Sequence, residues 1–328
     1  MVKIVKNLIK KYIPYSIQRR YHKNTSIRYL FQKIHLTKKI SNTPAENLLL
    51  NVNNPDYTEI YDRYFKVKSD HSFWIDWFDD SDFKNFKGEN VFVTQLAGLR
   101  SIKKAYENTV SYAIKIDELG LMGIFDEDRK FGVESVKIGK ESFSRDRVDS
   151  VIEINYFSRL MGITSESELR LVDIGAGYGR LASRVLQAFP NAYVFCGDVV
   201  PQATFLCNFY LKFKGFNSFK FKCGSYDELT LEGTFDIAVN IHSFSEAPLD
   251  SIKKWLDIVS SKTKYIFIVP SGDELASMEY DGSRLCYMDY LKYLGYQLVN
   301  ITNKYGEELF EKNLCLSPAK YYYFKKKL

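Results

Sequence analysis

The residues most able to do chemistry lie in a polar turn, Asn240-Ile-His-Ser-Phe-Ser-Glu246, that follows a short apolar segment. Within it, His242 is the only histidine in the second half of the chain. An imidazole exchanges a proton near neutral pH, so His242 is a candidate general base, with the carboxylate of Glu246 close in sequence. A second polar segment, Ser144-Arg-Asp146, supplies Asp146 as a further candidate. These residues predict removal of a proton from a substrate, although a lone histidine is more often structural.

A glycine-rich stretch, Leu171-Val-Asp-Ile-Gly-Ala-Gly-Tyr-Gly-Arg180, is the second candidate site. An apolar run ending in Asp173 meets three glycines at alternate positions, and apolar residues at helical spacing follow. Glycine lets a backbone approach a ligand closely, and the first turn of a helix offers free N–H groups. The pattern predicts a strand, a tight turn and a helix that bind a nucleotide-type ligand. The alternative is a tight connection with no ligand.

The spacing of the glycines narrows the choice of ligand. A dinucleotide site needs G-x-G-x-x-G and a P-loop needs G-x-x-x-x-G-K-[ST], and this turn matches neither. Its D-x-G-x-G-x-G order instead resembles the first motif of class I methyltransferases, which use S-adenosylmethionine. That cofactor carries no phosphate, so the turn would hold an amino-acid tail and a ribose.

The segments around these motifs alternate between strand and helix patterns, which predicts an α/β fold. The expected strands cover residues 171–173, 192–198, 219–223, 235–240, 265–269, 296–301 and 320–324. Residues 181–189 and 201–213 are predicted to be helices. We therefore predict a Rossmann-like, doubly wound parallel sheet of seven strands, preceded by a mostly helical N-terminal region. Ligands bind at the carboxyl ends of such strands.

The ends of the predicted strands supply candidate cofactor contacts. Asp198 follows the second strand, 23 residues after Gly175, where an acid hydrogen-bonds ribose hydroxyls in nucleotide-binding sheets. Gly224-Ser-Tyr-Asp227 follows the third strand, at the place where methyltransferases hold adenine. The predicted cofactor-binding residues are Asp173, Gly175, Ala176, Gly177, Tyr178, Gly179, Asp198, Val199, Ser225, Tyr226, Asp227 and Asn240.

The charge is concentrated in the first segment of the chain. The 328 residues carry a net charge of +6, yet residues 1–45 hold 11 Lys and Arg and no acidic residue. Apolar residues at helical spacing among these lysines predict a basic amphipathic helix, which suits an anionic membrane surface, a groove on a partner, or the body of the same chain. No base-reading feature accompanies it, so we expect no nucleic-acid partner.

The organisation expected from these patterns has three parts. They are a basic arm at 1–45, a mostly helical region at 46–150 and a methyltransferase domain at 151–328. No run is long and apolar enough for a membrane span and no signal peptide is expected, so we predict a cytoplasmic protein, peripheral at the inner face of the cell membrane if the arm binds there. Residues 73–78 are predicted to be aromatic core, and 137–146 to be a loop.

The five cysteines form no C-x-x-C pair and are odd in number. They are typical of reduced, mostly buried thiols. The four histidines are scattered along the chain, so no metal site is expected.

A closer resemblance comes from the glycine turn together with Asn240-x-His-Ser-Phe-x-Glu246. With Glu127-Asp-x-x-Phe-Gly132, Ser144-Arg-Asp146 and Glu153-Ile-Asn155, these segments resemble the bacterial sugar O-methyltransferases from about residue 106 to residue 268. The resemblance implies methylation of a sugar hydroxyl during surface-polysaccharide or glycolipid assembly.

The same resemblance assigns roles around the acceptor. It implies that Ser144, Arg145 and Asp146 border the active site, and that His242 and Glu246 face the acceptor with Ser243 between them. The chain departs from the family at Ala247-Pro248, and the basic arm lies outside the resemblance.

Other functions stay open at this point. A nucleic-acid amino-methyltransferase would show an Asn/Asp-Pro-Pro-aromatic run where this chain has Asn240-Ile-His-Ser. A nicotinamide oxidoreductase would need the longer glycine fingerprint. A methyltransferase of another small molecule, or a binding module without catalysis, fits the same motifs.

Overall fold

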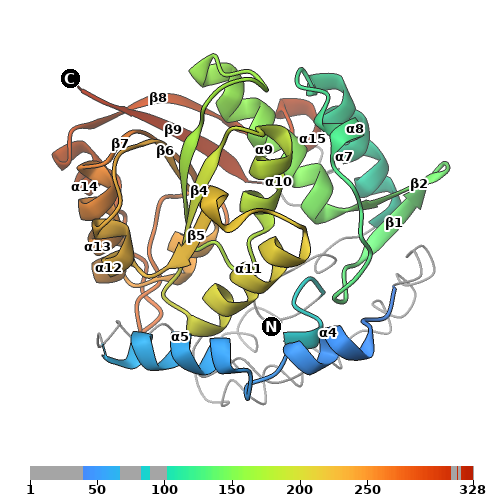
Figure 1. The fold of residues 1–328 in the computed structure, drawn as a ribbon. Coiled ribbons are helices and arrows are strands. Elements are labelled where there is room, and N and C mark those ends of the chain that lie inside the picture. Colours follow the sequence, from blue (N-terminus) through green and yellow to red (C-terminus); the bar gives the residue numbers. More distant parts are fainter. Residues whose placement is uncertain (1–39, 67–82, 89–101, 312–315, 317–318, 328) are drawn as a thin grey trace, which may run out of the picture.

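The structure is a computed structural model that describes residues 40–66, 83–88, 102–311, 316 and 319–327 (Figure 1). Most of the basic arm and the aromatic cluster at 73–78 lie outside the described residues, so what is predicted of them stays a prediction. Within the described part, helices cover both faces of a central sheet. None of the described helices is both long and apolar enough to cross a membrane.

The central sheet has seven strands in the order β5-β4-β3-β6-β7-β9-β8. Their bounds are β3 (Arg170–Ile174), β4 (Tyr193–Gly197), β5 (Phe221–Gly224), β6 (Phe235–Ile241), β7 (Thr263–Val269), β8 (Tyr296–Asn303) and β9 (Lys320–Lys326). All seven predicted strands are confirmed, and β5, β4, β3, β6 and β7 run parallel.

The prediction of a wholly parallel sheet is wrong for β9, which pairs antiparallel with both β7 and β8. A parallel β9 would need a long crossover over the face of the sheet. Among its described residues, the connection that precedes it carries only the five-residue helix α15 (Glu307–Glu311). The chain therefore turns back and inserts β9 beside β8 as a hairpin partner.

Two helical layers bury the sheet, as expected for a doubly wound fold. One layer contains α7 (Ile102–Ile116), α9 (Arg145–Met161), α10 (Arg180–Ala188) and α11 (Pro201–Phe213); the other contains α12 (Tyr226–Thr230), α13 (Leu249–Ser260) and α14 (Met288–Tyr293). Side chains alternate along a strand, so Leu171 of β3 packs in the first core and Val172 in the second. Short apolar strands are thereby buried on both faces.

The region before the sheet is mostly helical in its described part, as predicted. It contains α4 (Pro44–Leu49), α5 (Pro55–Lys66), α7 and α8 (Leu121–Ile124). The loop predicted at 137–146 is wrong, because β1 (Ser135–Ile138) and β2 (Glu141–Ser144) form an antiparallel hairpin there. The hairpin closes at Gly139, whose φ of 63° suits a two-residue turn.

Helix α9 links the N-terminal region to the sheet. The Oγ of Ser144 accepts a hydrogen bond from the N–H of Arg147 at 3.1 Å, so Ser144 is the N-cap, and Gly162 ends the helix with a φ of 69°. The predicted domain boundary at residue 150 falls inside this helix. Most of α9 is buried, so both regions share one core.

Helix α5 packs across α11 through an aromatic face (Figure 1). Tyr57, Ile60 and Tyr64 lie on one side of α5 and are buried against the same cluster as Phe205 and Tyr210. The ring centroids of Tyr57 and Phe205 are 5.6 Å apart in an edge-to-face arrangement. This packing holds α5 beside the carboxyl ends of β4 and β5.

Candidate active site

The glycine turn, residues Gly175–Gly179, connects β3 to α10 and is fixed by its own backbone. The N–H groups of Gly175 and Ala176 donate to the carbonyl of Gly197 at 2.7 and 3.1 Å. The N–H of Gly177 donates to Oδ2 of Asp198 at 3.0 Å. The turn is therefore tied to the end of β4, the neighbouring strand.

The three glycines of the turn meet three different requirements, and all have positive φ. A Cβ on Gly175 would lie 2.1 Å from Oγ of Ser243, and one on Gly179 would lie 2.8 Å from Sγ of Cys207. A Cβ on Gly177, at φ +57°, would meet none of the described atoms within 4 Å. Gly175 and Gly179 thus permit packing, whereas the backbone of Gly177 faces open space that a ligand can approach.

Two predicted cofactor carboxylates each have a buried oxygen without a hydrogen-bond partner among the described residues. They are Oδ2 of Asp173, at the end of β3, and Oδ2 of Asp227, in the first turn of α12. Burial raises the pKa of Asp173 to about 7. Buried polar atoms are normally paired, so each oxygen is a strong acceptor placed to meet a donor or a cation.

Asp198 lies where the ribose acid was predicted, directly after β4. Its Oδ1 accepts from the N–H of Val200 at 3.0 Å, and its Oδ2 from the N–H of Gly177. Burial raises the pKa of Asp198 to about 6, against the effect of these backbone donors. Each carboxylate oxygen has a second lone pair, so Asp198 can hold the turn and still accept from a ligand hydroxyl.

The remaining predicted cofactor positions have protein partners. Ser225 and Glu228 form a capping box at the start of α12, and Tyr226 packs edge-on against Trp255 at 5.8 Å between ring centroids. Val199 is partly buried against the core under α12–α14. Tyr178 is buried and donates its hydroxyl to Oδ2 of Asp146 at 2.9 Å.

Asn240 and Ser243 tie the end of β6 to the glycine turn. Nδ2 of Asn240 donates to the carbonyl of Ile174 at 3.0 Å, and Oγ of Ser243 donates to the same carbonyl at 3.2 Å. Oδ1 of Asn240 accepts from the N–H of Phe244 at 3.2 Å. Asn240 is predicted to bind the cofactor and Ser243 the substrate, but here both side chains fix the turn that follows β6.

His242 has a strained backbone, with φ 69° and ψ −31°. Such values are rare outside glycine and cluster at functional sites. Two hydrogen bonds hold it there, from its N–H to the carbonyl of Val269 at 2.7 Å and to its carbonyl from the N–H of Ser245 at 3.0 Å. The ring is thereby fixed at the carboxyl end of β6, and its Nδ1 is buried with no hydrogen-bond partner among the described residues.

The expectation that His242 titrates near neutrality is wrong for this structure. Burial, followed by the positive charges of Lys304 and Arg145, lowers the pKa of His242 to about 3. The imidazole is therefore neutral throughout the physiological range, with an open lone pair or N–H at Nδ1 and a weakened affinity for a proton.

The two candidate carboxylates near His242, Asp146 and Glu246, have different environments. Asp146 accepts from Tyr178 and from Nε of Arg184, the latter at 3.3 Å. Glu246 lies at the end of the 3-10 helix η4 (Ser243–Glu246). Burial raises its pKa to about 7, against the opposing effect of the positive charge of Arg284. The carboxylate whose charge acts on His242 is instead Asp149.

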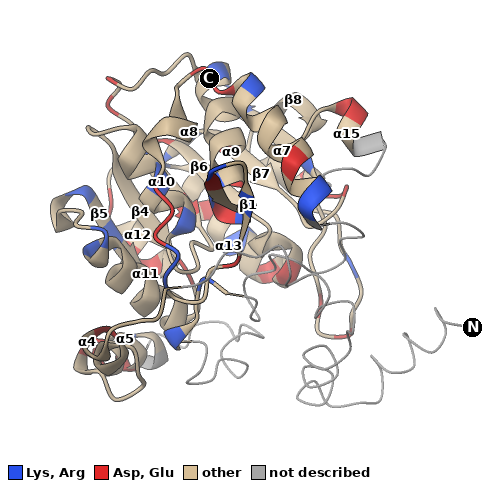
Figure 2. Ribbon diagram, turned by 90° about the vertical axis from the view of Figure 1, so that its right-hand side faces the viewer, with Lys and Arg blue, Asp and Glu red and all other residues tan. Residues whose placement is uncertain are grey.

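A buried group of charges that the sequence did not reveal lies beside His242. We call it the α9 charge network; its members are Arg145, Asp149, Glu153, Arg180 and Lys304. Nζ of Lys304 lies 2.9 Å from Asp149 and 2.7 Å from Glu153, and the side chains of Lys304 and Glu153 are 0% exposed. Figure 2 marks the charged segments of α9 within the ribbon.

The rest of the network connects α9 to the glycine turn. Nε of Arg145 lies 3.0 Å from Asp149, and Nη1 of Arg180 lies 2.7 Å from Glu153. Tyr305 donates its hydroxyl to Asp149 at 2.7 Å. Against the effect of burial, Lys304 and Arg145 hold the pKa of Asp149 well below its usual range. The predicted substrate residue Arg145 is thus part of an ordered polar surface, whereas Ser144 serves as a helix cap.

A sequence signal for half of this network did exist. Arg145, Asp149 and Glu153 recur at every fourth position, which places three charged side chains on one side of a helix. No local pattern pointed to Lys304, which comes from the turn after β8.

Helix α5 adds a second feature that the sequence did not reveal. The hydroxyl of Tyr64 donates to the carbonyl of Asp198 at 3.0 Å, and Arg63 lies 2.9 Å from Glu228, the capping residue of α12. Helix α5 therefore braces the two turns, after β4 and after β5, that carry Asp198 and Asp227. We call this pair of contacts the α5 brace.

The strand order with its single reversed strand is that of the Rossmann-like methyltransferase fold. No protein-family model matches the chain, and no curated protein matches it. Solved structures similar to it include an S-adenosylmethionine-dependent methyltransferase from Clostridium acetobutylicum ATCC 824, with 13% identity over 55% of this chain and 91% of that chain and a TM-score of 0.41.

Two further similar structures are magnesium protoporphyrin IX methyltransferase from Synechocystis PCC 6803 with bound SAM and the mitomycin 7-O-methyltransferase. The first has 10% identity over 67% of this chain and 97% of that chain, with a TM-score of 0.39. The second has 13% identity over 69% of this chain and 68% of that chain, with a TM-score of 0.38. At these identities and scores the fold assignment rests on the sheet itself, and nothing follows about a shared substrate.

Proposed function

We propose that this protein is an S-adenosylmethionine-dependent O-methyltransferase that acts on a sugar hydroxyl in surface-polysaccharide or glycolipid biosynthesis. The observation that supports this cofactor is the glycine turn, where the backbone of Gly177 faces open space and the neighbouring Asp173 has a buried oxygen with no partner in the described part of the chain. A turn of this kind admits a ligand closely and offers it an acceptor.

The chemical groups of S-adenosylmethionine suit the carboxylates at the strand ends. The cofactor supplies a methyl group activated by a positive sulfur. Its ammonium group would meet Asp173, its ribose hydroxyls Asp198, and its adenine amine Asp227. Two of these carboxylates have an oxygen without a partner among the described residues, and Asp198 keeps free lone pairs. A ligand without phosphate fits a turn that faces three acids.

We propose His242 as the base that takes the proton from the acceptor hydroxyl. It is neutral at physiological pH, and the strained backbone after β6 fixes its ring at the end of the sheet where the ligands of such folds bind. The pKa of about 3 makes it a weak base, so alignment of the hydroxyl contributes alongside proton removal. Glu246, with a pKa of about 7, is the competing candidate.

The sugar acceptor is supported by the resemblance of the glycine turn and the His242 segment to sugar O-methyltransferases. The distribution of charge favours a sugar over a nucleic acid, because residues 46–328 hold 35 basic and 40 acidic residues. A methyltransferase of another small molecule and a cofactor-binding module without catalysis remain the alternatives.

Calorimetric titration of the full chain tests the cofactor. We expect S-adenosylmethionine and S-adenosylhomocysteine to bind, and NAD not to bind. Tight binding of NAD would overturn the assignment.

Mass spectrometry of the host's surface glycans, with and without this protein, tests the acceptor. The proposal expects a loss of methyl groups from a sugar. Cofactor binding with unchanged glycan methylation would favour the binding module.

We further propose that the basic arm, residues 1–45, holds the enzyme on the anionic inner face of the cell membrane, near a lipid-linked acceptor. Its support is the excess of 11 positive charges over residues 1–45, together with the amphipathic helix predicted at the start of this segment. Sedimentation with anionic vesicles should pull down the protein at low salt and release it at high salt. Equal behaviour with neutral vesicles would leave the arm as a helix packed on the body.

A further inference from the structure

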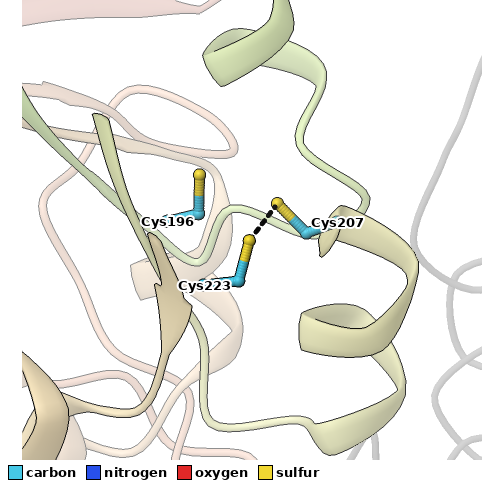
Figure 3. Close-up of side chains that lie close together, drawn as sticks. All are labelled: Cys196, Cys207 and Cys223. Atoms are coloured by element: carbon cyan, nitrogen blue, oxygen red, sulfur yellow. Dashed lines mark hydrogen bonds between the residues drawn. The ribbon is translucent and has the colours of Figure 1, made fainter. Parts of the chain in front are cut away.

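Three cysteines from three separate elements converge behind the glycine turn. Cys196 comes from β4, Cys223 from β5 and Cys207 from α11, and their sulfur atoms all lie within 4.8 Å of one another (Figure 3). Sγ of Cys223 is 3.4 Å from Sγ of Cys207, and none of the three is in a disulfide. No metal site is expected from the sequence, because the histidines are scattered and the cysteines form no C-x-x-C pair, yet the fold brings these three thiols together.

The register of the sheet explains the convergence. Cys196 and Cys223 are direct partners on the adjacent parallel strands β4 and β5, so their side chains leave the same face of the sheet. Helix α11 packs across that face and brings Cys207 against them. Thiols that are 11 and 16 residues apart along the chain thus become neighbours.

Three converging sulfurs make a soft donor set. Thiolates select Zn²⁺ and Cu⁺ over hard cations such as Mg²⁺. Sulfurs held in a plane around one ion at about 2.3 Å lie about 4 Å apart, close to the present spacing. Among the described residues, no histidine or carboxylate joins the three cysteines, whereas structural Zn²⁺ takes four protein ligands. A three-sulfur set of this kind suits a monovalent soft ion.

One of the three thiols is more accessible than the other two. Cys223 is partly buried, whereas Cys196 and Cys207 are buried, so an ion can reach Cys223 first.

We propose that Cys196, Cys207 and Cys223 bind one monovalent soft metal ion, of the class of Cu⁺, in a buried three-thiolate site. Binding forms three metal–sulfur bonds, and the S–H protons that remain on the thiols are released to solvent; the metal and the sulfurs keep their oxidation states. The site is independent of the proposed methyl transfer, although Sγ of Cys207 lies directly behind Gly179 of the glycine turn.

Titration of the reduced full chain with Cu⁺ under anaerobic conditions, against a competing Cu⁺ chelator, tests the proposal. We expect one Cu⁺ per chain and an ultraviolet thiolate-to-metal band. Cys223→Ser and Cys207→Ala should each weaken binding by ~100-fold or more, because loss of even a supporting residue costs 10–100-fold at metal sites. Binding of Zn²⁺ should be weaker than that of Cu⁺.

The matched control removes the other two thiols. Cys286 is exposed, and Cys315 lies outside the described residues. The Cys286→Ser, Cys315→Ser double variant should keep both the stoichiometry and the band. Circular dichroism and melting of every variant separate a lost ligand from a lost fold. A band that survives in folded Cys223→Ser, or that disappears in the control variant, would overturn the proposal, as would tighter binding of Zn²⁺.

Discussion

The glycine turn and the α9 charge network meet at Arg180, yet different kinds of group stabilise them. The turn is held mainly through its backbone N–H groups, and three of its five positions are glycine. The network is held by five charged side chains that close almost entirely on one another. One half of the site therefore requires positions without a side chain, and the other half requires that each buried charge has an opposite charge beside it.

The largest effect should come from adding atoms to the turn. Gly177→Val should abolish binding of S-adenosylmethionine in calorimetry, because the new side chain occupies the open space that the backbone faces. The control is Gly162→Val, at φ +69° and equally open, which carries the same backbone strain at the end of α9. Equal losses of binding in both variants would assign the effect to strain.

The next effect should come from removing a charge from the network. Lys304→Met leaves Asp149 and Glu153 buried without their shared cation, so the free energy of unfolding should fall by about 3–5 kcal/mol. Chemical denaturation measures it. Adding Glu153→Gln to Lys304→Met should restore part of the loss.

The matched control for this change is an exposed ion pair. Lys292 and Asp289 lie 2.8 Å apart with side chains 63% and 92% exposed. Lys292→Met should therefore change stability by less than about 1 kcal/mol. A similar small effect in Lys304→Met would show that the network adds little.

A smaller effect distinguishes the two candidate bases. His242→Ala should lower turnover by about 10²-fold, the lower end for a positioned base because its pKa is low, with cofactor affinity nearly unchanged. If His242 is the base, its ascending limb lies near pH 3, and the pH–rate profile stays flat from pH 6 to pH 8.

The alternative predicts a different profile. If Glu246 is the base, the rate should rise with pH through its pKa of about 7, because only the carboxylate accepts a proton. Glu246→Gln would remove that limb. Wild-type turnover in His242→Ala together with such a limb would transfer the role to Glu246.

The smallest effect should come from replacing Asp198, the carboxylate that contacts the glycine turn and is proposed to accept from the ribose of the cofactor. Asp198→Ala should weaken binding of S-adenosylmethionine by about 1–3 kcal/mol, the range for hydrogen bonds to a charged group. Titration calorimetry measures it, with the exposed Asp281→Ala as the control. Unchanged affinity in Asp198→Ala would restrict Asp198 to its contacts with Gly177 and Val200.

Local sequence predicted the strand, turn and helix of the glycine turn well, because they are contiguous. The glycine turn needs only a strand, three glycines and a helix in succession, and Asp198 stands at the end of the next strand. Each of these features can be recognised from a few consecutive residues. The same holds for the seven strands, whose apolar runs are short and bounded by turn residues.

The charge network and the three cysteines could not be predicted in this way. Lys304 meets Glu153 across 151 residues, and nothing near Lys304 marks it as buried. Cys196 and Cys223 become neighbours only through the register of β4 and β5. The environment of His242 depends on the same distant partners, so its low pKa could not be inferred from its place in a polar turn.

The α5 brace also sets an order of events during synthesis. Tyr64 leaves the ribosome 134 residues before Asp198, its partner, which corresponds to roughly 7–27 s at ordinary rates of translation. Throughout that interval the aromatic face of α5 has no sheet to cover. It docks only after β4 and α11 have formed, which makes the brace a late, long-range contact. Helix α5, although it is made early, is thus expected to be among the last of the described elements to settle, and to depend most on chaperones until then.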